Sequence, residues 1–164
     1  MLRPLETTDI DRLGQLWLHL ACTHHPSLPV SYWEARLQDT LEQLQRLYAA
    51  MQSSGFSHVS ANDEPRLTAW VYANPRDDIA EGLVAITPDN ELHTVFVAPT
   101  QQRQGIGSTL MAQAMYDRNQ LEVTVLEENL HGRYFLQKHG FEETARSYSM
   151  EARQDELVMM CRAA

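Results

Sequence analysis

Cysteines and long apolar runs are both scarce in this chain. Cys22 and Cys161 are the only cysteines among 164 residues, too few for a disulfide framework, so we expect two reduced thiols and assign them no chemistry. No apolar run approaches the roughly 18 residues that a membrane span needs, and the Met1–Pro4 start lacks the basic-then-apolar design of a signal peptide. We therefore expect a cytoplasmic protein without a membrane partner.

Positive charge is also in short supply. Only 13 basic residues stand against 22 acidic ones, which leaves a formal net charge of −9 at pH 7. This balance disfavours binding to a polyanion such as DNA or RNA, so no nucleic acid is expected among the partners. A cationic amine fits such a chain better.

The length suits one domain over residues 1–164, and no repeat, linker or low-complexity tract divides it. Apolar periodicity and turn residues predict an α/β order with a mixed sheet. The expected elements are a strand at 2–5, helices starting near Thr8 and Ser31, an antiparallel meander at 67–72, 82–87 and 92–97, a helix at 105–118, a strand at 121–126, a helix at 129–139, and strands at 144–150 and 157–162. Residues 53–66 are polar and turn-rich.

The most informative segment lies between Val97 and Leu110. A strand-like run ends at Pro99 and the chain reopens as a helix led by Gly105 and Gly107. Glycines let the backbone approach a ligand closely, and the first N–H groups of a helix are unsatisfied and carry the positive end of its dipole. Such a turn is an anion cradle, and a phosphate is its usual occupant.

The spacing of the glycines decides which phosphate ligand the cradle takes. A Walker loop needs Gly-Lys-Ser/Thr, but Ser108 follows Gly107 directly, and a dinucleotide fingerprint needs a third glycine where Leu110 stands. The remaining pattern, Gln102-x-x-Gly105-x-Gly107 after Val97-x-Pro99, resembles the acyl-CoA pyrophosphate loop of the GNAT superfamily of N-acyltransferases.

A second segment resembles the other signature of that family. Asn129 stands twelve residues before Phe141, in a helix that ends in Gly140-Phe141. In the family this asparagine opens a helix beside the pantetheine arm. The order of the expected elements and the Arg3-Pro4 and Asp9 start also resemble the family, while residues 22–66 match it only in element type.

The resemblance implies a GNAT fold, in which a central, mostly antiparallel sheet contains one splayed parallel strand pair and about four helices flank it. It implies acetyl-CoA as co-substrate and a primary amine as acceptor, attacked directly in a ternary complex. Family members are often homodimers, and the sequence leaves the oligomeric state open. The residues implied to bind CoA are Val95, Phe96, Val97, Gln102, Arg103, Gln104, Gly105, Ile106, Gly107, Ser108, Asn129 and Phe135.

Three residues are candidates for the chemistry. A free alkylammonium is almost wholly protonated at neutral pH, so its attack needs a base. The lysine-acetylating branch of the family keeps a glutamate eleven residues ahead of the loop's first glutamine, which is Glu91 here, and His93 is the rival base on the same side of the strand. A backbone N–H near Val95 resembles the family's oxyanion donor.

One position departs from the family pattern. The family often places a tyrosine seven residues after the motif asparagine to protonate the departing thiolate, and this chain has Leu136 there. Tyr134 lies about 200° from Leu136 around a helix, so we expect it to pack rather than to substitute. Because of Leu136, a non-catalytic acyl-CoA-binding module remains the alternative hypothesis.

The break between the first two helices carries His24-His25-Pro26 and Tyr32-Trp33. In the family the acceptor site opens there, and aromatic side chains can form a wall for a cation, although such residues more often cap helices and pack a loop. The adjacent histidines have no third ligand at metal-site spacing, so no metal is expected. The acceptor remains open between a protein lysine, an N-terminus and a small amine. A loose similarity to bacterial family members with a His-Pro-x-x-x-x-Tyr-Trp segment favours a protein or peptide amine.

Overall fold

The computed structural model describes residues 1–53 and 68–163, and its order of elements is the predicted one. The helices are α1 (Ile10–His24), α2 (Val30–Ser53), α3 (Ile106–Met115) and α4 (Leu130–Lys138), with 3-10 turns at Thr7–Asp9 and Pro99–Gln101. The strands are β1 (Leu2–Pro4), β2 (Thr68–Ala73), β3 (Ala80–Ile86), β4 (Leu92–Val97), β5 (Gln120–Leu126), β6 (Glu142–Ser149) and β7 (Gln154–Arg162). Most of the expected turn-rich stretch, from residue 54 to residue 66, lies outside the described residues. No helix in the described ranges is both long and apolar enough to cross a bilayer.

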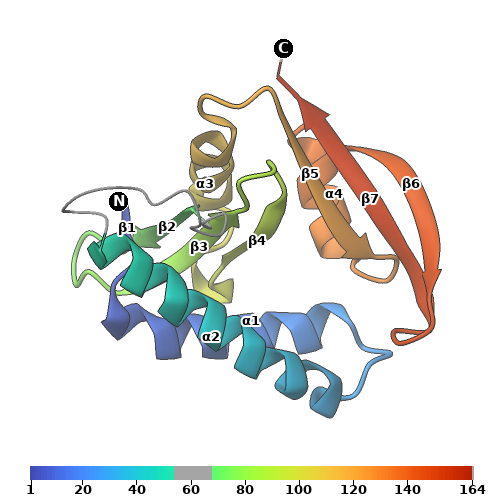
Figure 1. Cartoon of the computed structure of the whole chain (residues 1–164), viewed down its shortest axis with the longest axis horizontal. Coiled ribbons are helices and arrows are strands. Elements are labelled where there is room, and N and C mark those ends of the chain that lie inside the picture. The colour runs from blue at the N-terminus through green and yellow to red at the C-terminus, as the bar shows by residue number, and fades with distance from the viewer. Residues whose placement is uncertain (54–67, 164) are drawn as a thin grey trace.

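The strands form two sheets rather than one continuous sheet (Figure 1). The first has the order β1-β2-β3-β4 and the second the order β5-β7-β6, and every pairing inside them is antiparallel. The predicted parallel relation between β4 and β5 exists as a single bridge between Glu91 and Glu122, just ahead of β4. Beyond that bridge the two strands separate.

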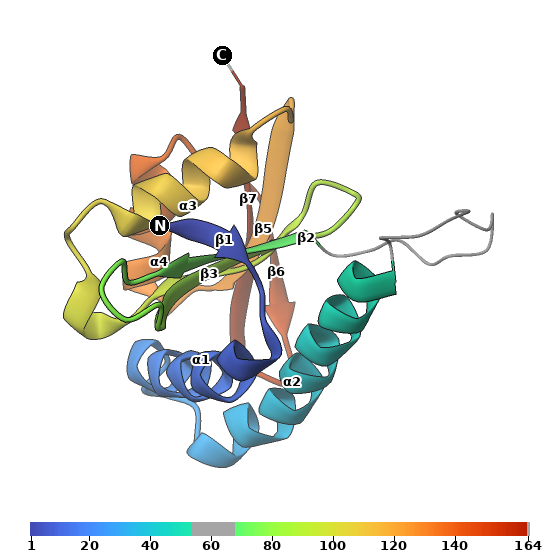
Figure 2. The ribbon, with the colours of Figure 1, turned by 90° about the vertical axis from the view of Figure 1, so that its left-hand side faces the viewer.

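Strand β3 lies at the centre of the first sheet and is buried on both faces. Its apolar run does not alternate with polar residues because helices cover both sides of the sheet: α1 and α2 lie on one face and α3 on the other (Figure 2). Leu83 packs in the cluster with α1 and α2, while Val84 points into the cluster that contains α3.

The α3 cluster joins the two sheets. It combines Val84 and Leu92 of the first sheet with Leu121 of β5, Leu136 of α4 and Met159 of β7. Burial of these side chains therefore holds the sheets together where backbone pairing does not.

Strand β6 forms the outer edge of the second sheet (Figure 1) and is exposed along almost its whole length. Arg146 of β6 lies among three carboxylates, at 2.7 Å from Glu143, 3.1 Å from Glu127 and 3.5 Å from Asp155. The hydrogen bonds that Arg146 donates to Glu143 and the surrounding negative charge raise the pKa of Arg146, so this cation persists at every working pH.

A buried ion pair fixes the beginning of α1 against β1. Arg3 donates to both carboxylate oxygens of Asp9, at 2.8 and 2.9 Å, and the backbone N–H of Glu6 donates to Asp9 at 2.9 Å. Asp9 is only 5% exposed. Hydrogen bonding to Asp9 outweighs desolvation and raises the pKa of Arg3, so the guanidinium stays charged.

Replacing Asp9 by asparagine should therefore destabilise the fold. Asp9→Asn removes the buried counter-charge of Arg3, and breaking a buried pair in this way costs about 3–5 kcal/mol. Asp78→Asn is the matched control, because Asp78 also accepts from Arg3 but is 55% exposed, and exposed pairs contribute only about 0–1 kcal/mol. Urea unfolding at constant m-value measures both, and equal midpoints for the two variants would contradict the assignment.

Candidate active site

A groove of about 780 Å³ opens where β4 and β5 separate. Its walls come from α1 and α2 on one side, from β4 and β5 in the middle, and from the α3 loop and α4 on the other side. The lining includes the predicted residues His93, Val95, Phe96, Val97, Gln102, Arg103, Gly105, Gly107, Ser108, Asn129 and Phe135. The fold thus brings most of the predicted site into one cavity.

The start of α3 forms one part of this groove. Gly105 adopts φ +79°, a left-handed conformation that glycine takes at little cost, and it turns the chain into the helix. Among the residues that the structure describes, no side chain caps the start of this helix. Its first N–H groups are thus available to an anion, and the helix dipole favours negative charge there.

Gly107 is required for a different reason, namely close packing between α3 and α4. A Cβ atom at this position would lie 2.8 Å from Cε2 of Phe135, a distance that real Cβ contacts do not show. Asn129 caps α4 by accepting a hydrogen bond from the N–H of Gly132 at 2.9 Å. Both predicted motifs therefore shape the groove through backbone geometry.

The loop ahead of α3 is fixed to the end of β4. The side-chain amide of Gln102 donates to the carbonyl of Val97 at 3.1 Å, so this glutamine ties the loop to the strand. Arg103 has φ +67° and lines the groove. Lys138, near the end of α4, also lines it, and the two cations give this end of the groove a charge suited to phosphates.

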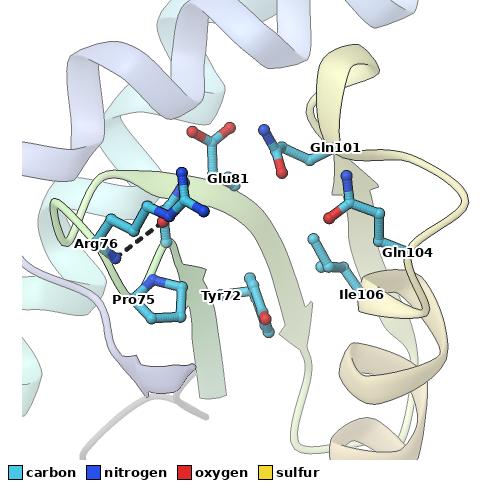
Figure 3. Close-up of a pocket in the computed structure, with 8 residues that line it drawn as sticks. Tyr72, Pro75, Arg76, Glu81, Gln101, Gln104 and Ile106 are labelled. Atoms are coloured by element: carbon cyan, nitrogen blue, oxygen red, sulfur yellow. Dashed lines mark hydrogen bonds between the residues drawn. The ribbon is translucent and has the colours of Figure 1, made fainter.

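Gln104 and Ile106 point elsewhere. Their side chains line a second cavity of about 330 Å³ behind the loop, together with Tyr72, Gln101 and Glu81 (Figure 3). Glu81 is buried there and is paired with Arg12 at 3.0 Å, so its charge is already balanced. The loop lies between β4 and α3, as the sequence predicts. Which of its side chains face the groove could not be predicted from the sequence.

The two candidate bases occupy different positions. Both residues are exposed, but His93 lines the groove, whereas Glu91 is not part of the lining. Desolvation lowers the pKa of His93, against the opposing charge of Glu91, so the imidazole is neutral at pH 7 and can accept a proton. Val95, Phe96 and Val97 of β4 also line the groove. One edge of β4 pairs with β3, and its other edge faces the groove instead of another strand.

Aromatic rings gather at the other end of the groove. Trp17 and Trp33 meet edge to face at 5.8 Å, and His25 lies 4.5 Å from Trp33 while its Nδ1 donates to the carbonyl of Ala21 at 2.7 Å. In the part of the chain that the structure describes, Trp33 Nε1 is the buried side-chain nitrogen that has no hydrogen-bond partner. These side chains pack the connection between α1 and α2, as is expected of residues with a structural role. They also line the groove.

His24 of α1 stacks on His131 of α4 with ring centroids 4.4 Å apart. Burial and the neighbouring histidines lower the pKa of His24, which keeps the pair from being doubly charged at neutral pH. Within residues 1–53 and 68–163, no group of three His, Cys, Asp or Glu residues could hold a metal ion.

Leu136, which stands where the family often has a tyrosine, is a core residue. Leu136 is 2% exposed and belongs to the core cluster that joins the two sheets, while its surface also reaches the groove. Tyr134 was expected to pack, and this is wrong. Its side chain is 67% exposed and lines the groove, because the α4 face that carries it does not meet the core.

Sequence reasoning missed several lining residues. Lys138 follows Phe135 by one helical turn, so the period of α4 could have revealed it. No local signal marks Trp17 or His131, because the contact between α1 and α4 brings them into the groove.

Comparison with known proteins agrees with this geometry. Residues 65–143 match the model of the acetyltransferase (GNAT) domain family. The chain is also similar to the peptidyl-lysine N-acetyltransferase YiaC of Escherichia coli, with 26% identity over 141 residues that cover 86% of this chain and 82% of that protein.

Solved structures share the fold over the full length of the chain. The PaiA N-acetyltransferase of Thermoplasma acidophilum, in complex with coenzyme A, superposes with a TM-score of 0.75 at 17% identity and covers 99% of this chain and 98% of that one. Apo YjaB of Escherichia coli gives a TM-score of 0.71 at 20% identity, with coverage of 100% and 98%. The matched segment contains the point where the two sheets part at β4 and β5 and the glycine-led start of α3. Residues 65–143 of this chain are thus identified as a GNAT acetyltransferase domain.

Proposed function

We propose that this protein transfers an acetyl group from acetyl-CoA to a primary amine by direct attack in a ternary complex. The observation that carries the proposal is the uncapped N-terminus of α3 at the wall of the groove, flanked by Arg103 and Lys138. Backbone N–H groups and two cations suit the pyrophosphate of an acyl-CoA. The coenzyme A complex of the PaiA structure supports the same class of donor.

The β4 edge supplies the means to polarise the thioester carbonyl. A strand edge without a neighbouring strand presents N–H groups at fixed positions, and one preorganised donor near Val95 can lower the barrier by a few kcal/mol, about 3 kcal/mol in known cases. We assign the base to Glu91, which would act through a water because its side chain lies outside the lining. His93, inside the lining and neutral at pH 7, is the alternative.

We propose a peptide or protein amine as the acceptor. Among the described residues, the groove lining contains no aspartate or glutamate, and its acceptor end carries the aromatic and imidazole side chains together with Leu20 and Ala21. A polyamine would find no carboxylate there for its remaining charges. The unpartnered indole N–H of Trp33 suits a carbonyl oxygen beside the reacting amine. The similarity to YiaC, named as a peptidyl-lysine N-acetyltransferase, points the same way.

Thiol release from acetyl-CoA across an amine panel tests the proposal, with Gly107→Val as the comparison. We expect release with lysine-containing peptides and little with spermidine. A branched side chain at 107 must displace Phe135, so calorimetry should show at least a tenfold weaker acetyl-CoA affinity, whereas Thr109→Val, two residues further along α3 and outside the lining, should keep it. Tight binding without release for any amine would identify a CoA-binding module. An unchanged acetyl-CoA affinity in Gly107→Val would contradict the assignment of the pyrophosphate site to the start of α3.

Removing the proposed base should slow the reaction and change its pH profile. Glu91→Gln keeps the shape and removes the basicity, so kcat/KM should fall by roughly 10²- to 10⁴-fold and the acidic limb should disappear. His93→Gln is the paired variant. If His93→Gln abolishes the acidic limb of the pH profile while Glu91→Gln keeps the parental rate, the base is His93. The limb should then lie below pH 6.5, because the pKa of His93 is lowered.

Restoring the family's tyrosine should raise turnover. Leu136→Tyr places a phenol hydroxyl where the family protonates the departing thiolate, but it enlarges a residue that is 2% exposed in the core, at a cost of about 1–3 kcal/mol in stability. Leu136→Phe controls for the ring without the hydroxyl. Turnover compared at matched folded fraction should rise in the tyrosine variant alone. Equal turnover in both variants would mean that thiolate protonation does not limit the rate.

A further inference from the structure

Three segments far apart in the sequence meet at the carboxylate of Glu128. Ser27, between α1 and α2, donates its backbone N–H to Glu128 Oε1 at 3.0 Å and its hydroxyl to Oε2. Gln154, at the start of β7, donates to Glu128 Oε2 at 2.8 Å and to the Ser27 hydroxyl oxygen at 3.3 Å. In return, its carbonyl oxygen accepts the backbone N–H of Glu128 at 3.0 Å.

The carboxylate is the group that makes this arrangement possible. Three donors converge on it, and hydrogen bonds to an ionised acceptor are about twice as strong as neutral ones. Burial alone would raise the pKa of Glu128, but the hydrogen bonds from Ser27 and Gln154 outweigh it and hold this pKa below its ordinary value. A neutral amide at this position would present a donor to Ser27 or Gln154 and lose part of the set.

These contacts lie directly beside the acceptor end of the groove. His24 and His25 precede Ser27, and Trp33 follows it; all three line the groove from the α1–α2 side. Asn129 and His131 follow Glu128 and line it from the α4 side. The stacked pair of His24 and His131 crosses between the same two walls. The carboxylate of Glu128 itself is not part of the lining.

We propose that Glu128 is a positioning residue that fastens the α1–α2 connection, residues 25–29, across the acceptor end of the groove. This inference rests on the proposed function. Glu128 touches neither co-substrate. By holding Ser27 it fixes the relative positions of the walls that carry Trp33 and His131, and so determines how the acceptor amine is held.

The kinetic test compares Glu128→Gln with Glu127→Gln. Glu127 is the adjacent carboxylate, paired with Arg146 on the outer surface, and serves as the matched control. For Glu128→Gln we expect the acceptor KM to rise about tenfold, with kcat within twofold of the parent and an unchanged acetyl-CoA Kd. Glu127→Gln should match the parent in all three. An unchanged acceptor KM, or an equal loss of acetyl-CoA affinity, would overturn the assignment.

Exchanging the two partners provides the rescue. In Glu128→Gln/Gln154→Glu the carboxylate moves to position 154, where it accepts from the amide at 128 and from the backbone N–H of residue 128. This double variant should recover most of the acceptor KM, whereas Gln154→Glu alone places two carboxylates together and should raise it. Failure of the exchange to recover any KM would count against a local positioning role.

Hydrogen exchange of the full chain gives a readout that does not depend on activity. Exchange of the Ser27 and Leu28 amides, which donate to Glu128 and to the His25 carbonyl, should become at least tenfold faster in Glu128→Gln and stay parental in Glu127→Gln. If no amine is acetylated, this measurement still decides the positioning claim. Parental exchange in Glu128→Gln would refute the claim even in an active enzyme.

Discussion

The single parallel bridge between Glu91 and Glu122 is the constraint on which the rest of the site depends. It fixes β4 next to β5 at one point, and beyond that point neither strand supplies the other with hydrogen bonds in the described part of the chain. Two complete antiparallel sheets stabilise the strands from their outer sides. The groove therefore exists without disrupting either sheet, because backbone groups that would pair in a continuous sheet are left facing it.

The loop ahead of α3 contains backbone conformations that are unfavourable unless the surrounding fold enforces them. Arg103 has φ +67°, which costs a non-glycine residue about 1–2 kcal/mol. The bond from Gln102 to Val97 and the packing of α3 on the first sheet hold the loop in place. A strained loop beside an uncapped helix is typical of a site whose geometry is set before its ligand arrives.

Local signals were enough to predict much of this structure. Gly105, Gly107 and Asn129 sit in motifs whose backbone requirements can be read from the residues themselves, and the apolar periodicities placed the elements to within a few residues of their bounds. The strand-helix-strand order predicts that β5 runs parallel to β4, and the family likeness added that the two strands are splayed. These features depend on interactions within one element or between neighbours in the chain.

Features that depend on distant segments could not be predicted in the same way. The direction of the Gln104 and Ile106 side chains, the exposure of Tyr134 and the meeting of Ser27, Glu128 and Gln154 follow from how whole elements pack. His24 and His131 are more than a hundred residues apart in the chain, and no local sequence pattern around either residue predicts that their rings stack.

The exposed strand β6 has a consequence for the behaviour of the protein in concentrated solution. An open strand edge can recruit another strand and start aggregation, and charged side chains are a common protection against it. Arg146 and the carboxylates around it provide such protection along much of β6, whereas Tyr148 and Met150 near the end of the strand are largely exposed. Resistance to self-association along this edge thus depends on the charges around Arg146 and is weakest at the turn into β7.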